Sequence, residues 1–514
     1  MELFVDTPDK KKIVFIQTIF DSDQHTCALD TLEDAVKVNR QTIFSLWQSI
    51  LEDIRLANFS ELITIDYFST NYLFRMSIAE AFNIQTLINL YVKRSIKYRL
   101  LYSLLTTTFG TLQEAADRLN VSYIQIRRVI ADLNVFLESI NLTIHSRRTV
   151  FLAGDEITLR FFYTVLFVST DGITFWPFPS FRYHEISALL DNCPKEVFHS
   201  KSLDKLAFTH FYLAVHLLRE RQGFPVGKKD LTISLYQPYS DSSKDEFRAF
   251  CHSLRTYLPQ YSEAKLIENA QIICSSIVAL GGYASVDAVP DFFFADNELF
   301  QQDFTQKAAA IIAQIDNYLY QPLTADEKNR MLYLILCLHY RIAYIGKPLE
   351  KLRNLLPYYF HEATDLRKQY KMAATQSLIE QVLHSMDLSP ADPFYDYMLF
   401  QYCLIYDKCT EFEKHNAPIT VAFVSIISNH TMQKDITQYF SSYFNLTIAD
   451  SLSREIDLII SEVTISAEVV SVLRLHPPIL YCHQKLVDSD YEKLTEALAA
   501  IANKNSKLIL DGRT

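Results

Sequence analysis

Apolar positions recur at helical spacing over residues 111–140 and then alternate with polar positions up to residue 152. Two short helices separated by a tight turn are therefore predicted, the second of them over about Tyr123–Ile140. Ser122 precedes the second helix, where its hydroxyl can accept a hydrogen bond from an unpaired backbone N–H. The apolar faces expected to be buried are formed by Leu112, Ala115, Ala116 and Leu119 in the first helix and by Ile126, Val129, Ile130, Leu133 and Leu137 in the second.

The residues after the second helix predict a β-hairpin with a cationic tip. Apolar and polar residues alternate over 142–145 and 149–152, on either side of Ser146, Arg147 and Arg148. Helix, turn, helix and hairpin form the layout of a winged helix-turn-helix, in which the second helix faces the major groove of DNA and the wing contacts phosphate or the minor groove. The residues expected to contact DNA in this unit are Ser122, Tyr123, Gln125, Arg127, Arg128, Arg147 and Arg148.

A similar pattern precedes this unit in residues 1–75. One apolar face is expected from Leu32, Ala35, Val36 and Val38, with Asn39 at the break. The second helix of this unit then begins with three polar residues that could contact DNA, and the alternating segment 62–68 could be its wing. A packing or dimerising role suits this unit equally well. Its candidate contact residues are Arg40, Gln41 and Thr42.

The distribution of charge distinguishes the two units. The chain of 514 residues has a net charge of −11, so contact with nucleic acid has to be local. Residues 85–160 contain ten basic and six acidic residues, whereas residues 1–60 contain six basic and ten acidic ones. Phosphate contact requires cations, so the second unit is the stronger candidate for binding DNA. A solvated surface that happens to carry arginines would give the same count.

The rest of the chain changes character twice. Residues 159–288 and 289–412 are aromatic, helical in pattern and without strand alternation, and Gly281-Gly282 with Pro290 indicates a border between them. Each of these modules has histidine in an amphipathic helix that also carries arginine. In residues 413–514, short β-branched runs alternate with helices, which predicts a small parallel α/β sheet. The histidines in question are His210, His216 and His339.

Composition supports a mainly α-helical, multidomain chain. Only 9 glycines and 16 prolines argue against an all-β or loop-rich protein. The eight cysteines form no CxxC pair, which is typical of reduced, buried thiols in a cytoplasmic protein. No signal peptide, membrane-spanning run, catalytic motif or metal-ligand spacing is found, so neither an enzyme nor a cofactor is expected. The alternative to a DNA-binding protein is a helical scaffold without DNA contact.

The predicted order of units is 1–75, 76–158, 159–288, 289–412 and 413–514. Two helix-turn-helix units, two histidine-bearing helical modules and an α/β unit, in this order, resemble the Mga/AtxA group of bacterial transcriptional (virulence) regulators. The resemblance covers essentially the whole chain and rests on domain order more than on any single motif. It implies that the helical modules are phosphotransferase-system (PTS) regulation domains, abbreviated PRDs. The last unit would be similar to the IIB component of sugar permeases.

The resemblance also implies how the protein works. The family consists of DNA-binding regulators, commonly activators, that respond to carbohydrate status through histidine phosphorylation. His210 and the five residues after it fit the PRD pattern well, His216 is the runner-up, and His339 matches loosely because Arg341 follows early. The expected partners are double-stranded DNA, PTS proteins as phosphodonors, and a second copy of the chain bound through the C-terminal unit. The alternative is a scaffold that responds to PTS components without binding DNA.

The IIB-like unit departs from the enzyme that it resembles. In a functional IIB, the phosphorylated cysteine follows the first strand in a loop that surrounds phosphate. Here residues 424–430 contain neither cysteine nor glycine. Cysteine phosphotransfer is therefore not expected, and the unit is interpreted as an interaction or dimerisation module.

Overall fold

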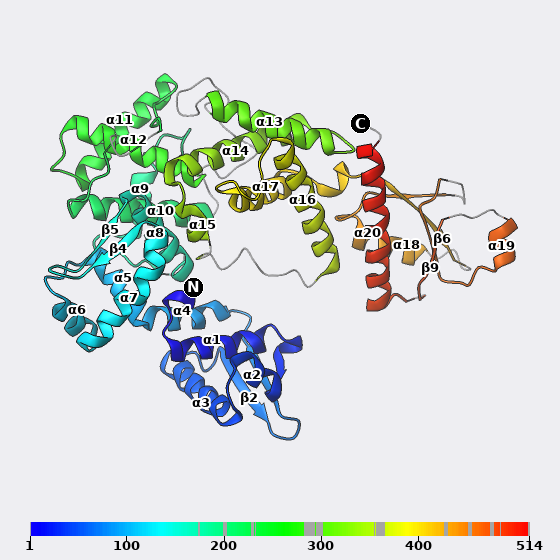
Figure 1. The fold of residues 1–514 in the computed structure, drawn as a ribbon, viewed down its shortest axis with the longest axis horizontal. Coiled ribbons are helices and arrows are strands. Elements are labelled where there is room, and N and C mark those ends of the chain that lie inside the picture. The colour runs from blue at the N-terminus through cyan, green and yellow to red at the C-terminus, as the bar shows by residue number, and fades with distance from the viewer. Residues whose placement is uncertain are drawn as a thin grey trace.

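The computed structural model is mainly helical and divided into several units, with the C-terminal α/β unit at one end of the molecule (Figure 1). Its small sheets confirm the predicted mixture of helical and α/β parts. The structure describes residues 2–172, 175–198, 203–227, 231, 233–281, 293, 302–353, 355, 365–425, 430–450, 455–472, 477–483 and 485–511.

The N-terminal unit is a helix-turn-helix packed on a three-stranded antiparallel sheet of order β1-β3-β2. The predicted alternating segment 62–68 is the first strand of its hairpin, and Trp47 of α3 donates a hydrogen bond to the Ile65 carbonyl at 2.8 Å. Ala35, expected on the apolar face, is exposed, because the buried side of α2 is formed by Leu29, Leu32 and Val36. The elements are α1 (Thr7–Phe20), β1 (Thr26–Ala28), α2 (Leu29–Val36), α3 (Arg40–Leu56), β2 (Ile63–Phe68) and β3 (Leu73–Ile78).

The second unit follows the predicted winged layout. All nine residues predicted on the apolar faces of its two helices are buried. The second wing strand begins at Phe151 rather than Thr149, because Val150 donates its backbone N–H to the Phe109 carbonyl instead of pairing across the hairpin. The elements are α4 (Ile84–Arg94), α5 (Ile96–Thr106), α6 (Leu112–Leu119), α7 (Tyr123–Ser139), β4 (Leu142–His145) and β5 (Phe151–Gly154).

Helix α8 (Glu156–Thr170) begins directly after the wing and spans the predicted border at residue 158. Asp155 caps it by accepting the Thr158 N–H at 2.7 Å. Almost every residue of α8 is buried, and the helix packs along α10 (Leu203–Arg221). The wing is therefore joined to the helical modules without a flexible connection.

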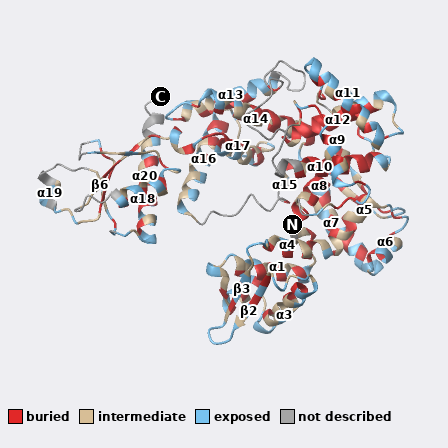
Figure 2. Cartoon of the chain, turned by 180° about the vertical axis from the view of Figure 1, so that it is seen from behind, coloured by how far each residue is buried: buried red, intermediate tan, exposed pale blue. Residues whose placement is uncertain are grey.

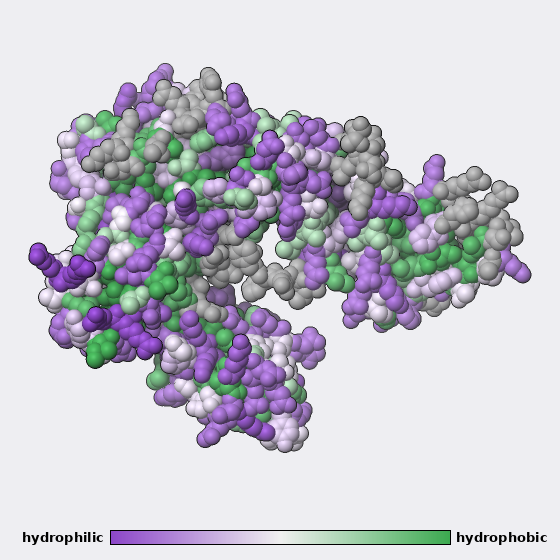
Figure 3. All heavy atoms as spheres, in the orientation of Figure 1, coloured by the Kyte–Doolittle hydropathy of each residue, from purple (hydrophilic) through white to green (hydrophobic). Residues whose placement is uncertain are grey.

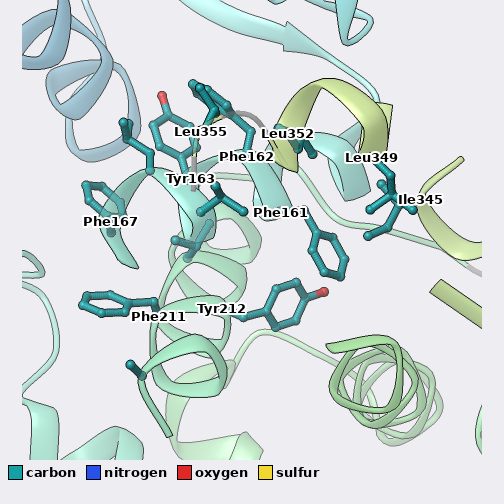
Figure 4. Packing of buried hydrophobic residues seen from close by; sticks show 14 of the residues in the cluster. Phe161, Phe162, Tyr163, Phe167, Phe211, Tyr212, Ile345, Leu349, Leu352 and Leu355 are labelled. Atoms are coloured by element: carbon teal, nitrogen blue, oxygen red, sulfur yellow. The ribbon is translucent and has the colours of Figure 1, made fainter. Parts of the chain in front are cut away.

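The helical modules share one continuous core, in which α8, α10, α12 and α14 carry most of the buried residues (Figure 2). Tyr212 donates to Ser276 at 2.5 Å, and Ser276 is 2.7 Å from the Tyr344 hydroxyl, so polar contacts also join α10, α12 and α14. Figure 4 shows Phe161 between Tyr212 and Ile345. The other helices are α9 (Tyr183–Leu190), α11 (Asp241–Tyr257), α12 (Glu263–Leu280), α13 (Gln302–Tyr318), α14 (Ala325–Ile345), α15 (Pro348–Arg353), α16 (Leu366–Ser385) and α17 (Tyr395–Cys409).

The predicted border between these modules falls partly outside the described residues. Gly281 ends α12 in the left-handed conformation, with φ of 71°, while Gly282 and Pro290 lie in segments that the structure does not describe.

The C-terminal unit is a parallel four-stranded sheet of order β7-β6-β8-β9, as the alternation of strands and helices predicted. It has its own small apolar core, and α20 packs against α16 of the preceding module. The short helix α19 was not predicted, because six residues carry too little periodicity. The elements are β6 (Ile419–Val424), α18 (His430–Phe440), β7 (Leu446–Ile448), β8 (Leu458–Ser461), α19 (Ala467–Val472), β9 (Ile479–Tyr481) and α20 (Asp488–Asp511).

A cluster of charged side chains joins α1, α3 and α4 of the N-terminal region. Arg94 donates to Asp9 and to Asp53, each at 2.7 Å, and Lys12 donates to Asp53 at 2.6 Å. Burial raises the pKa of Asp53, but the hydrogen bonds from Arg94 and Lys12 outweigh it and hold that pKa below its ordinary value. The Arg94 guanidinium also lies over the Tyr91 ring at 4.6 Å.

Replacing Arg94 by Met should destabilise the N-terminal unit by about 2–3 kcal/mol, because Asp9 and Asp53 would keep only one cation between them. Urea unfolding followed through Trp47 fluorescence measures this loss. Because the folded pKa of Asp53 is lowered, the stabilisation is present above about pH 4 and is lost as the pH falls through the folded pKa.

The control is Arg55→Met, which removes the exposed ion pair with Glu52. This change should leave the free energy of unfolding close to that of the parent chain, because an exposed ion pair contributes little to stability. Both variants are made in a Trp176→Phe background, which leaves Trp47 as the only tryptophan. Equal losses in the two variants would contradict a structural role for the Arg94 cluster.

Candidate nucleic-acid interface

Local hydrogen bonds fix the turn between α6 and α7. Thr111 caps α6 by accepting the Glu114 N–H at 3.1 Å, and Asn120 ends it in the left-handed conformation with φ of 54°. Asparagine tolerates this conformation better than most residues. Ser122 then caps α7 by accepting the Gln125 N–H at 3.2 Å, as predicted from the sequence. The start of α7 is thus held at a defined angle to α6.

The face of α7 that points away from the core carries the predicted contact residues. Tyr123, Gln125, Arg127 and Arg128 are all exposed. Within the described part of the chain, neither arginine forms an ion pair or a side-chain hydrogen bond. Their charges are therefore available to a polyanion.

The wing is anchored to the middle of α7 by Asn134, which the sequence analysis did not single out. Its side-chain oxygen accepts the Ile144 N–H at 2.8 Å, and its amide donates to the Ile144 carbonyl at 3.2 Å. Arg147 and Arg148 are exposed at the tip and, among the described residues, make no ion pair. In Figure 3 strongly hydrophilic spheres gather at the edge where Figure 1 places this hairpin.

The N-terminal unit presents a weaker surface. Asn39 caps α3, because its side-chain oxygen accepts hydrogen bonds from the Thr42 N–H at 3.0 Å and from the Thr42 hydroxyl at 2.9 Å. The Thr42 hydroxyl is therefore already hydrogen-bonded within the protein. The Arg40 guanidinium lies over the Tyr72 ring at 4.8 Å, although Arg40 and Gln41 are exposed. Arg40 and Gln41 could both contact DNA, but the Arg40 side chain already packs against the hairpin of its own unit.

Of the histidine candidates, His216 is fully buried in a polar cluster. Arg160 donates to its Nδ1 at 2.6 Å, and its Nε2 lies 3.3 Å from the Asn269 side-chain oxygen. Burial and the neighbouring Arg160 charge lower the pKa of His216 to about 3, so the imidazole is neutral at physiological pH. Glu220 accepts from the same guanidinium at 2.9 Å.

The other two candidates lie in aromatic surroundings. The His210 ring stacks on Tyr183, with the ring centres 4.6 Å apart, and is buried. His339 is half-buried, and its Nε2 is 2.7 Å from the Tyr402 hydroxyl. Burial lowers the pKa of His339 to about 4. A phosphodonor could reach these two rings only after some local opening of the helices.

Across the described residues, no three His, Cys, Asp or Glu side chains are grouped so that they could hold a metal ion. None of the helices described is both long enough and apolar enough to cross a membrane.

Comparison with protein families identifies the second unit. Residues 80–167 match the model of the Mga helix-turn-helix domain, a segment that runs from just before α4 into α8. The chain is therefore a DNA-binding transcriptional regulator of the helix-turn-helix class. It carries a Mga-type domain, so the resemblance to Mga-type regulators is confirmed over these residues. No curated protein matches the chain.

The double change Arg147→Ala with Arg148→Ala should weaken DNA binding and flatten its dependence on salt. Log affinity falls as log salt rises, and each phosphate contact that is lost makes this slope less negative by about 0.9. Titration of a fluorescent duplex at several salt concentrations measures both quantities.

The matched control is Arg248→Ala with Arg255→Ala, which removes two exposed arginines from α11. This variant has the same net charge but should keep the wild-type slope. If the two double variants lose the same affinity and show the same change in salt dependence, the net charge of the protein and not the wing would explain the binding.

Proposed function

We propose that this protein is a cytoplasmic regulator, acting as a global activator of transcription, whose binding to double-stranded DNA is controlled by histidine phosphorylation. The observation that carries the proposal is the set of exposed arginines on α7 and the wing, inside the segment that matches the Mga domain. The phosphodonors are PTS proteins. The helical modules act as PRDs, and the regulator works as a homodimer held by its C-terminal unit.

The connection from histidine to DNA runs through α8 and α10. His210 and His216 lie on α10, which packs along α8, and α8 begins directly after the wing. A phosphoryl group brings about two negative charges into a buried aromatic site, which disfavours the existing packing. Loss of the His210–Tyr183 stack would release α10 from α9, and because α10 is packed along α8, the wing would move with them.

The C-terminal unit supplies no obvious phosphotransfer chemistry of its own. The segment after β6 has no cysteine, and residues 426–429 lie outside the described part of the chain. A parallel sheet with a separate core suits a module for self-association. Two copies on one DNA raise affinity through effective concentration, which favours a symmetric dimer.

His210→Asp and His210→Ala should change transcription from a target promoter in opposite directions, by about fivefold or more at equal protein level. Aspartate supplies part of the negative charge of a phosphorylated histidine, whereas alanine removes the acceptor. His252→Asp, at an exposed position on α11, is the matched control and should behave as the wild type.

Phosphorylation can be followed directly in the purified chain. The ring centres of Trp176 and Tyr183 are 5.2 Å apart, and Tyr183 is the ring that stacks on His210. The fluorescence emission of Trp176 should therefore shift when His210 is phosphorylated. The experiment uses a Trp47→Phe chain with phosphoenolpyruvate and the general PTS phosphocarrier proteins, followed by mapping of phosphohistidine by mass spectrometry. Wild-type behaviour of both His210 variants, with no phosphate on His210, would make this residue structural.

Removing residues 417–514 should reduce the mass of the particle in light scattering from that of a dimer to that of a shortened monomer, if the C-terminal unit holds the dimer. This boundary keeps His415, which contacts the Gln321 carbonyl and the Glu327 carboxylate at 2.8 Å each. The preceding module therefore keeps the polar contacts that His415 makes. A mass equal to that of a dimer of the shortened chain would place the interface in the helical modules instead.

A further inference from the structure

One stripe of α7 points directly away from the core of the winged unit. Residues at positions i, i+4, i+7 and i+11 share one side of a helix, and here they are Ile124, Arg128, Ala131 and Val135. All four are exposed, and the buried residues of α7 occupy the opposite side. This stripe is the part of the recognition helix that would enter the major groove most deeply.

Ile124 is an unusual residue for this stripe, because 80% of its surface is exposed at the start of α7. It adds nothing to the apolar core. A β-branched side chain is also less favourable in an exposed helix than alanine or a straight-chain residue. Neither packing nor helix formation therefore accounts for an isoleucine here, whereas contact with an apolar group outside the protein would.

We propose that Ile124 reads thymine by packing against its 5-methyl group in the major groove. This inference rests on the proposed DNA binding and names one feature of the sequence that is bound. Thymine alone among the four bases presents a methyl group in that groove, and aliphatic side chains can recognise it. The first turns of a recognition helix are the ones that reach base edges.

The same geometry separates base-reading residues from phosphate-binding ones. Arg128 lies one turn after Ile124 on the same stripe, where a guanidinium can contact guanine. Gln125 and Arg127 lie about a quarter turn to either side, towards the walls of the groove where the phosphates are. Ile124 and Arg128 therefore supply sequence preference, and Arg127 supplies affinity.

The test uses a synthetic duplex selected from a random-sequence pool for tight binding to the full-length wild-type protein. A second duplex has the same sequence with every thymine replaced by deoxyuridine, which removes the methyl groups and keeps the base pairing. Affinity for both duplexes is measured for the wild type, Ile124→Ala and Val135→Ala.

Val135 provides the matched control on the same helix. It is also β-branched, is 78% exposed and lies on the same stripe, but it is eleven residues further along α7. That distance is about 17 Å along the helix axis, beyond the turns that reach base edges. Val135→Ala therefore removes an exposed apolar side chain without affecting the proposed contact.

The wild type and Val135→Ala should bind the deoxyuridine duplex at least about fourfold more weakly, the effect expected for one buried methyl group. Ile124→Ala should bind the thymine duplex as weakly as the wild type binds the deoxyuridine duplex, and it should not distinguish the two. If the wild type binds both duplexes equally, or if Ile124→Ala keeps the preference for thymine, this inference is overturned while DNA binding stands. If the wild type selects no duplex at all, the proposed function itself fails.

Discussion

The buried guanidinium of Arg160 holds the DNA-binding unit of this protein to its helical modules. It lies on α8, five residues after the cap that follows the wing, and it donates to His216 and Glu220 of α10 and to the Phe224 carbonyl. A charge without access to water is costly unless it is paired and hydrogen-bonded, so any motion that separates α8 from α10 meets a large penalty. The wing and the histidines of α10 are therefore firmly joined through α8, and under the proposed function a change in the packing of α10 would reach the wing.

Ion pairing inside the protein decides which cations remain for DNA. Six of the ten basic residues in segment 85–160 bind groups of the protein itself: Lys93, Arg94, Lys97, Arg99, Arg118 and Arg160. The four that remain are on α7 and the wing: Arg127, Arg128, Arg147 and Arg148. The excess of positive charge in the sequence indicated the correct segment for DNA binding, but only four of its ten basic side chains remain available for phosphate. Much of that charge stabilises the junctions between units, and a smaller, well-placed set is directed outwards.

The sequence predicted best those features that depend on neighbouring residues. The cap at Ser122, the apolar faces of α6 and α7 and the order of strands and helices after residue 413 all depend on local spacing. Contacts between distant residues could not be predicted in this way. Nothing local indicates that Val150 pairs with Phe109 or that Arg160 meets His216, since each partner is fixed only by the packing of whole helices. The exposure of Ile124 could have been predicted from the sequence, because this isoleucine lies outside the apolar period of α7.

The burial of His210 and His216 places a condition on the proposed switch. A phosphodonor needs access to an imidazole nitrogen, and the described packing gives little access to either ring. Under the proposed function, the helical modules would have to visit a second, more open arrangement before phosphorylation. The phosphoryl group would then stabilise that arrangement by preventing the return of the ring. His216 meets this condition only at a high cost, because freeing it would leave the buried Arg160 short of an acceptor. The same physical constraint that joins the wing to α10 thus favours His210 as the residue that is modified and His216 as part of the framework that responds.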